Sequence, residues 1–304
     1  MKEELNRGIQ LLNKFFFNLT VKNIIDTPPI DYNVDPSVKI VTMLKHSDIN
    51  MYLIAIKSFM WNFGYGSVEV IDDGSLTKED IENLQHHVPS INIFKADNVD
   101  ALNCPGYISW KRLFRIATLA QESYVIQLDS DTISLSPLID VHDKVKNNEG
   151  FLIGNDCWKQ PVDVEFLHNI VKRWSHNHPQ PKAEAIFKDI DFFNDGTKYL
   201  RGCAGFAGYP KNFARFDEIS SLSQQIEEKI GSLWNNWGSE QVATMCLISK
   251  TNNSSILPWP KYQNYRYPNT NESTEVASFI HFIGTTRYID MTYSKLVREY
   301  LKNK

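Results

Sequence analysis

The sequence lacks any run of the roughly 20 apolar residues that a membrane-spanning helix needs, so we expect no such helix. Charged residues interrupt positions 1–20 before any long apolar stretch, which argues against a signal peptide. The cysteines form no CxxC pair and no zinc-ligand spacing, and they predict four reduced thiols, Cys104, Cys157, Cys203 and Cys246. Together these absences predict a cytoplasmic protein.

An excess of basic residues is also absent. The formal net charge is −4, which argues against a general nucleic-acid binder. The composition, with 42% hydrophobic and 22% charged residues over 304 positions, is that of a globular protein with a sizeable core. Near the N-terminus, Leu11–Phe17 predicts a helix docked on the domain, with an amphipathic contact to a membrane surface as the alternative.

Strand and helix patterns alternate through the first half of the chain. Val38–Leu44 is short, apolar and rich in β-branched residues, as a buried strand requires, and the helical pattern after it ends at Gly64. The alternation gives strands at Val38–Leu44, Val68–Ile71, Ile91–Phe94 and Tyr124–Leu128, and helices at Ile49–Phe63, after Thr77 and at Trp110–Ala120. This spacing predicts βαβ units and a mainly parallel sheet.

The second half is less regular and suggests a mixed extension of the same sheet. It predicts strands near Phe151–Gly154, Ala204–Gly208 and Ser278–Ile283, and helices near Ser220–Ile230, Ser239–Ile248 and Tyr293–Leu301. Ligands of parallel sheets bind beyond the carboxyl ends of the strands. A site is therefore expected where Asp72-Asp73 and Asp129-Ser130-Asp131 end two of the predicted strands.

The strongest local signal is the segment Tyr124–Thr132, in which an apolar strand runs directly into Asp129 and Asp131. Acidic residues at i and i+2 of an extended segment point to the same side. There they can hold Mg²⁺ or Mn²⁺ against a diphosphate and offset the charge of a departing nucleoside diphosphate. The alternative is a pair of solvated turn carboxylates, with Asp131 capping a turn at Thr132.

This Asp-x-Asp motif after an apolar strand resembles that of glycosyltransferases with the GT-A fold. Val38–Lys45 is similar to the strand that runs under the nucleoside base, and Val70–Ser75 is similar to the acidic turn that contacts the nucleoside. The resemblance implies an α/β fold with a mostly parallel central sheet, flanking helices and a mixed C-terminal extension. It also implies donor contacts from Thr42, Asp72, Asp73, Asp129 and Ser130.

Three basic residues, Lys111, Arg112 and Arg115, lie on the predicted helix before the motif, at positions that often face the donor in such enzymes. The resemblance implies donor contacts from Lys111 and Arg115. A solvated helix face is the alternative for all three.

Later segments are similar to the GT8-like, retaining branch of these enzymes. Leu200–Gly208 takes the place of an FNSG-type strand without its Asn-Ser, and Trp237–Gln241 the place of an Asp-Gln pair that opens a helix. His281–Gly284 matches an HFxG segment, but Thr286-Arg287-Tyr288 replaces the usual Lys-Pro-Trp. The resemblance implies three metal ligands, Asp129, Asp131 and His281. It further implies catalytic roles for Glu240 and Gln241 and donor contacts from Gly205, Gly284 and Arg287.

Each of these residues also has a purely structural interpretation. Neutral imidazole suits Mn²⁺, but a lone histidine such as His281 more often packs in a core. Ser239 can cap the following helix, and the helix N-terminus can be the whole reason for Glu240. The glycines between Gly202 and Gly208 permit either contact with the donor sugar or close strand packing.

The order of motifs over about residues 38–290 implies the domain organisation. Residues 1–37 are expected to be a helical lead-in, and residues 38–304 a single catalytic domain. Within it we expect a nucleotide-binding half at 38–135, an acceptor-side half at 136–290 and a C-terminal helix at 291–304. An aromatic-rich region could stack on acceptor sugars or pack in the core, and comprises Trp234, Trp237, Trp259, Tyr262 and Tyr265.

The resulting expectation is a metal-dependent glycosyltransferase with Mn²⁺ or Mg²⁺ as cofactor. By resemblance it would move a sugar from a nucleotide-sugar, a UDP-hexose, to a glycan, lipid-linked or protein acceptor with retention. One alternative is an inverting transferase with Glu240 as the base. A sugar-phosphate nucleotidyltransferase is another, although no glycine-rich phosphate loop follows the first strand at Leu44–Asp48. A third is a non-catalytic carbohydrate-binding protein on the same fold.

Overall fold

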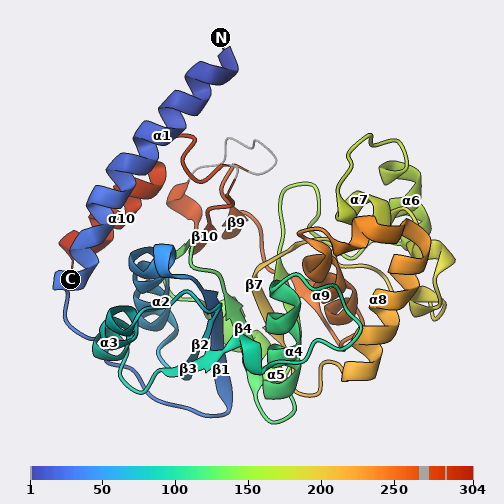
Figure 1. The fold of residues 1–304 in the computed structure, drawn as a ribbon, viewed down its shortest axis with the longest axis horizontal. Coiled ribbons are helices and arrows are strands. Elements are labelled where there is room, and N and C mark those ends of the chain that lie inside the picture. Colours follow the sequence, from blue (N-terminus) through green and yellow to red (C-terminus); the bar gives the residue numbers. More distant parts are fainter. Residues whose placement is uncertain (1, 267–273, 285, 304) are drawn as a thin grey trace.

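The computed structural model describes residues 2–266, 274–284 and 286–303 (Figure 1). Within these ranges seven strands form the main sheet in the order β3-β2-β1-β4-β7-β6-β8. β7 runs antiparallel to its neighbours, whereas the other pairs of this sheet are parallel. The strands are β1 (Val38–Leu44), β2 (Ser67–Asp72), β3 (Asn92–Lys95), β4 (Tyr124–Leu128), β6 (Phe151–Ile153), β7 (Cys203–Tyr209) and β8 (Ser255–Ile256). The predicted α/β fold with a mostly parallel central sheet is confirmed.

Helices cover both faces of this sheet, which explains why its central strands β1 and β4 are mostly apolar. Alternate side chains of β1 enter two separate cores, since Ile40 packs with α2 residues on one face and Val41 with α4 residues on the other. Figure 1 shows α2 and α3 on one side, and α4, α8 and α9 on the opposite side. The helices are α2 (Ile49–Phe63), α3 (Lys78–His87), α4 (Ser109–Leu119), α5 (Ile139–Asn147), α8 (Phe216–Ile230) and α9 (Ser239–Ser249).

Two short helices between β6 and β7 are absent from the sequence-based assignment. They are α6 (Val164–Val171) and α7 (Pro179–Glu184). The side chain of Asp163 caps α6 by accepting hydrogen bonds from the backbone N–H groups of Glu165 and Phe166. The aspartate at the start of α6 is a capping signal that the sequence contains. Helix α7 has only six residues, two of them prolines, and therefore shows no helical periodicity.

A second, small sheet brings a distant part of the chain to the end of β4. Its order is β5 (Thr132–Ser134), β10 (Phe279–His281) and β9 (Tyr262–Asn264). β10 pairs antiparallel with β5, and this register places His281 opposite Thr132. Because β5 begins directly after Asp131, the pairing fixes the histidine beside the acidic motif. Figure 1 shows β9 and β10 beyond the upper edge of the main sheet.

The two ends of the chain pack together. Helix α1 (Lys2–Val21) lies along α10 (Thr292–Lys302), as Figure 1 shows. Phe17 of α1 is buried and stacks on Tyr293, and the Asn13 amide donates a 3.0 Å hydrogen bond to the carbonyl of Tyr288. The predicted docked helix is present, and the division into domains and halves stays a prediction. In the described ranges no helix is both long and apolar enough to cross a bilayer.

Candidate active site

Backbone hydrogen bonds from three strands hold the acidic motif in place. Asp129 and Asp131 follow β4, and the Asp129 N–H donates to the carbonyl of Gly205 in β7 at 2.9 Å. The N–H of Phe282, just after β10, donates to the Asp131 carbonyl at 2.8 Å. Ser130, half-buried, lies between the two acids. The carboxylates are therefore fixed by long-range sheet contacts, which argues against the alternative of a solvated turn.

His281 joins the two carboxylates in one cluster. Ligand atoms of Asp129, Asp131 and His281 all lie within 4.8 Å of one another, and His281 Nε2 is 3.3 Å from Asp131 Oδ1. Two carboxylates and one imidazole are a suitable donor set for Mn²⁺ and acceptable for Mg²⁺. Because the imidazole directs a ring nitrogen toward the carboxylates, the residues present fit the implied metal ion.

The imidazole ring of His281 is held on its far side as well. Its Nδ1 lies 2.8 Å from Asn264 Oδ1, and Asn264 Nδ2 donates to the Gly154 carbonyl at 3.3 Å. Because the side-chain nitrogen of Asn264 donates to the Gly154 carbonyl, the side-chain oxygen of Asn264 faces the imidazole. This oxygen can only accept a hydrogen bond, so His281 Nδ1 carries a proton. This arrangement leaves Nε2 as the ring atom that can bind a metal ion, as is common when a second residue orients a histidine ligand.

Close packing against β7 sets the position of the same ring. A Cβ added to Gly205 would come within 2.6 Å of both His281 Nδ1 and Nε2. Only a glycine therefore leaves room for the imidazole at this point of β7. By contrast, a Cβ at Gly284 would meet nothing within 4 Å, and Gly284 is exposed. The two predicted glycines thus lie in very different surroundings.

Two arginines neutralise the carboxylates. Arg112 Nη1 donates to Asp129 Oδ1 at 2.9 Å and lies near Glu240, with Arg112 Nη2 at 3.5 Å from Glu240 Oε1. Arg287 pairs with Asp131. A metal ion would therefore compete with Arg112 and Arg287 for the same oxygens.

The ionisation of the two aspartates differs because their neighbours differ. Burial would raise the pKa of Asp131, but the positive charges of His281 and Arg287 outweigh it and lower that pKa to about 2. For Asp129, burial outweighs the effect of Arg112 and raises the pKa. Burial would lower the pKa of His281, yet the charge of Asp131 raises it well above its ordinary value. These groups therefore form one electrostatic unit.

Glu240 and Gln241 open helix α9 beside this cluster. Glu240 is buried, and its Oε2 has no hydrogen-bond partner among the residues that the structure describes. Burial raises the pKa of Glu240 despite the nearby Arg112. Gln241 Oε1 accepts a 3.4 Å hydrogen bond from Cys203 Sγ. An unpartnered buried carboxylate oxygen next to a metal-type cluster is the kind of group that meets a substrate hydroxyl.

The expectation that Ser239 caps α9 is wrong. The N-cap position belongs to Gly238, whose φ of 95° suits a glycine, and no side chain caps the helix there. Ser239 instead accepts a 2.9 Å hydrogen bond from Trp110 Nε1. This contact ties α9 to α4, so that Arg112 of α4 and Glu240 of α9 lie together.

The three basic residues of α4 have separate partners. Arg115 donates two hydrogen bonds to Glu69, at 2.7 and 2.8 Å, and Lys111 contacts Asp97 at 3.0 Å. Arg112, which the sequence analysis named with the other two but did not assign to the donor, is the one beside Asp129. Local sequence does not distinguish the three, because only the packing of α4 against β4 and α9 decides which side chain reaches the motif.

The residues predicted to contact the nucleoside form hydrogen bonds within turns and between strands. Asp72 Oδ1 accepts hydrogen bonds from the backbone N–H groups of Gly74 and Leu76, and Asp73 Oδ1 accepts from the backbone N–H and the hydroxyl of Ser75. The Thr42 hydroxyl is buried and donates to the Leu128 carbonyl at 2.5 Å. Asp72 and Thr42 lie on neighbouring strands that lead to the same edge as the acidic motif. Their contact with a donor stays a prediction.

The aromatic-rich region divides between core and surface. Trp234, Tyr262 and Tyr265 are buried, which favours the core-packing interpretation for these three. Trp237 is 60% exposed and meets His178 edge to face. Of the group it offers the largest exposed ring for a sugar, close in sequence to Glu240.

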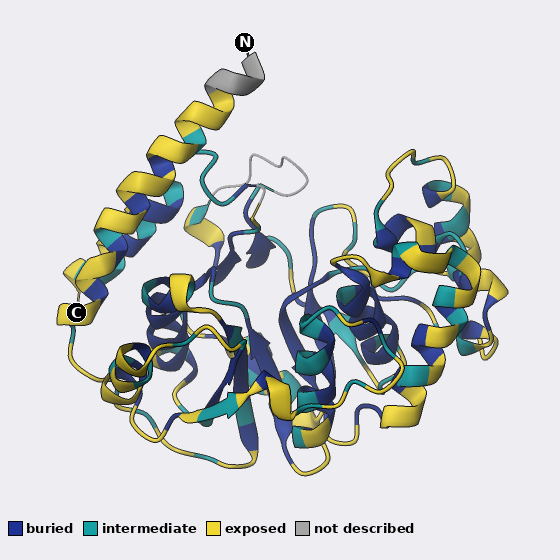
Figure 2. Ribbon diagram, in the orientation of Figure 1, coloured by how far each residue is buried: buried dark blue, intermediate teal, exposed yellow. Residues whose placement is uncertain are grey.

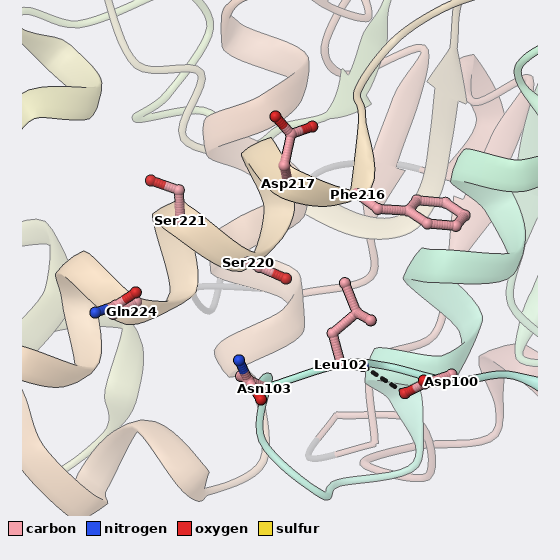
Figure 3. Close-up of a pocket in the computed structure, with 8 residues that line it drawn as sticks. All are labelled: Asp100, Leu102, Asn103, Phe216, Asp217, Ser220, Ser221 and Gln224. Atoms are coloured by element: carbon pink, nitrogen blue, oxygen red, sulfur yellow. Dashed lines mark hydrogen bonds between the residues drawn. The ribbon is translucent and has the colours of Figure 1, made fainter.

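A broad hollow of about 850 Å³ lies elsewhere on the surface, between the loop around Leu102 and helix α8 (Figure 3). Its lining consists mostly of exposed side chains such as Asn103 and Gln224, and none of the candidate site residues contributes to it. The acidic cluster, and not this hollow, therefore marks the candidate active site.

We predict that Asn264→Leu lowers the affinity for Mn²⁺ about tenfold, because the variant removes the acceptor that keeps the proton on His281 Nδ1. Asn264→Asp keeps an acceptor at the same place, so its affinity should stay close to that of the unmodified protein. Titration with Mn²⁺ alone, followed by electron paramagnetic resonance of the free ion, measures both. Equal weakening in the two variants would mean that Asn264 acts only through packing.

Comparisons with known proteins support the fold. No protein-family model matches the chain, and no curated protein sequence matches it. Among solved structures it is similar to the galactosyltransferase LgtC in complex with donor and acceptor sugar analogues, with a TM-score of 0.51, 13% identity, and coverage of 87% of this chain and 95% of that chain. An active-site mutant of LgtC gives a TM-score of 0.50 with the same identity and coverage. The mannosyltransferase Ktr4p from S. cerevisiae matches at 13% identity and a TM-score of 0.42, over 80% of this chain and 76% of that one. The chain therefore has the GT-A fold of glycosyltransferases, and the predicted resemblance is confirmed at the level of the fold.

Proposed function

We propose that this protein is a metal-dependent glycosyltransferase that moves a sugar from a nucleotide-sugar to an acceptor hydroxyl. The observation that carries the proposal is the cluster of Asp129, Asp131 and His281 at the carboxyl end of a central strand in this fold. Nucleotide-sugars bind to such sites through their diphosphate, which carries the negative charge that a metal–carboxylate centre recognises. Asp129, Asp131 and His281 would hold Mn²⁺ or Mg²⁺.

The metal ion, when bound, would supply Lewis-acid stabilisation of the charge that develops on the departing nucleoside diphosphate. Arg112 and Arg287 would supply fixed positive charge at the same place. Each now pairs with one of the metal-ligand carboxylates. With those oxygens holding the ion, Arg112 and Arg287 would be free to donate hydrogen bonds to the diphosphate.

Glu240 and Gln241 would face the donor sugar. The free Oε2 of Glu240 can accept a hydrogen bond from a sugar hydroxyl, and the amide of Gln241 can stabilise positive charge at the anomeric carbon without taking a proton. This division fits a transfer with retention from a UDP-hexose. The acceptor would be a hydroxyl of a glycan, a lipid-linked sugar or a protein, handled by a cytoplasmic enzyme.

An inverting transfer is the second candidate, and one observation favours it. Burial raises the pKa of Glu240, which brings a carboxylate closer to the range in which it can act as a general base. The anomeric configuration of the product, read by NMR, separates the two outcomes. The α or β configuration of the donor must be retained in the first case and reversed in the second.

Calorimetric titration of UDP and GDP, with and without Mn²⁺, tests the proposal. We expect one nucleotide to bind at least about tenfold more tightly with the metal, and the matching nucleotide-sugar to release its diphosphate slowly in water. Absence of metal-dependent binding for every nucleoside diphosphate and nucleotide-sugar would overturn the proposal. Release of pyrophosphate from a nucleoside triphosphate and a sugar phosphate would instead identify a nucleotidyltransferase.

A further inference from the structure

Helix α1 carries an apolar face that the rest of the described chain leaves uncovered. The side chains of Ile9, Leu11, Leu12, Phe15, Phe16 and Leu19 are between 42% and 61% exposed. They are six of the sixteen large apolar side chains exposed in the described ranges, gathered within eleven consecutive positions. Figure 2 shows that the described part of α1 is largely exposed. Scattered exposed apolar residues need no explanation, but a concentration of this kind marks a contact surface.

The exposed face is distinct from the face that docks on the domain. Asn13, Phe17 and Val21 follow a spacing of four and are buried, and Asn13 and Phe17 contact Tyr288 and Tyr293. Ile9, Leu12, Phe16 and Leu19 recur at spacings of three and four and form a separate stripe, widened by Leu11 and Phe15. Thus α1 is held by one side and offers a second apolar side outward.

Basic residues border this face, and their charge indicates a negatively charged partner. Arg7 and Lys14 are seven positions apart, so they lie along one edge of α1, and Lys22 follows at its end. All three are exposed, and none forms an ion pair with a residue whose side chain the structure describes, a set that begins at Asn6 near this end of the chain. On the neighbouring α10, Lys295, Arg298 and Lys302 form a second exposed row.

The charge of these two helices is opposite to that of the whole chain. Residues 2–22 and 292–302 contain seven Lys or Arg against three Glu, whereas the chain as a whole carries −4. An apolar helix face bordered by basic residues is attracted to anionic lipid headgroups while its apolar side chains enter the interface. If two copies of the chain paired through this face, their positively charged helices would repel each other.

We propose that α1 docks on the surface of an anionic lipid bilayer, with its Ile9–Leu19 face in the interfacial region. The helix lies in the plane of the membrane and does not span it, in accordance with the hydropathy of the chain. The Asn13 contact with the Tyr288 carbonyl joins the docked helix to the segment that carries Arg287. Docking would hold the candidate active site next to the membrane surface, but the lipid contact itself does not depend on the proposed activity.

Flotation with lipid vesicles tests the docking. We expect the full chain to float with vesicles of phosphatidylcholine that contain about 30% phosphatidylglycerol, and to bind pure phosphatidylcholine at least tenfold more weakly. The triple variant Leu12→Ser, Phe16→Ser, Leu19→Ser should lose at least about tenfold in binding. The variant Arg7→Gln, Lys14→Gln, Lys22→Gln should lose the preference for anionic vesicles.

A matched control removes the same number of exposed apolar side chains elsewhere, with Val34→Ser, Phe166→Ser and Val276→Ser. Each of these residues is at least 50% exposed, so the control should bind vesicles like the unmodified protein. Thermal unfolding checks that every variant is folded. Equal binding by the α1 variant and the control would overturn the proposal. A dimer that dissociates in the α1 variant, with no vesicle binding, would overturn it in favour of self-association.

Discussion

Replacing Asp131 with asparagine is expected to weaken Mn²⁺ binding by more than about 100-fold. Loss of a residue that only orients a metal ligand already lowers metal affinity by up to about 100-fold, and loss of a ligand should lower it further. Asp131 contacts both His281 and Arg287. The variant therefore removes one negative charge from the metal site. It also leaves the positive charge of Arg287 without its carboxylate partner, next to the position of the ion. Both effects oppose a divalent cation, since two unit charges at about 4 Å interact by roughly 4 kcal/mol near a protein surface. Calorimetric titration with Mn²⁺ alone measures the loss.

Two further variants make this result specific. Asp195→Asn removes a carboxylate that pairs with Lys250 on the surface, and its Mn²⁺ affinity should be unchanged. Arg287→Gln keeps all three metal ligands and removes a competing cation, so the affinity for Mn²⁺ alone should not fall, whereas the affinity for a nucleoside diphosphate should. If Asp131→Asn binds Mn²⁺ as well as the unmodified protein while remaining folded, the carboxylate is not a ligand.

Much of the fold is predictable because its first half follows a simple physical rule. A strand buried on both faces must be mostly apolar, and β1 and β4 appear as such at Val38–Leu44 and Tyr124–Leu128, with the same bounds in the structure. The second half depends on tertiary pairing. β10 lies within the strand predicted near Ser278–Ile283. β9 is absent from the sequence-based assignment, because it has only three residues and forms by pairing with β10, so it has no local periodicity.

The candidate site shows the same division between local and long-range information. Asp129 and Asp131 were identifiable because an apolar strand leads into them, and His281 because its segment resembles a known one. Arg112 was named only as one of three basic residues on a helix, and Asn264 was not noticed. Their positions beside the cluster depend on how α4 packs on α9 and how β9 pairs with β10. A basic residue on a helix and an asparagine in a short strand carry no such signal by themselves.

Gly205→Ala is expected to displace His281 and to affect both stability and metal binding. The added Cβ would lie within 2.6 Å of both ring nitrogens, and the ring cannot yield easily because Asn264 and Asp131 hold its two sides. Overpacking of this kind typically costs about 1–3 kcal/mol of unfolding free energy. We therefore expect that loss in urea unfolding, together with a fall of about 100-fold in Mn²⁺ affinity. Gly106→Ala is the matched control, since a Cβ there meets nothing within 4 Å.

A double variant shows whether the clash with His281 is the cause. In Gly205→Ala with His281→Ala, the ring is absent and the new methyl group has room, so most of the stability lost in Gly205→Ala should return relative to His281→Ala alone. Metal binding should stay weak, because the imidazole is gone. Coupling near zero between the two substitutions would mean that the alanine disturbs β7 itself, whose Gly205 carbonyl accepts the N–H of Asp129. Strong coupling would instead identify Gly205 as the residue that makes room for His281 in the cluster with the two aspartates.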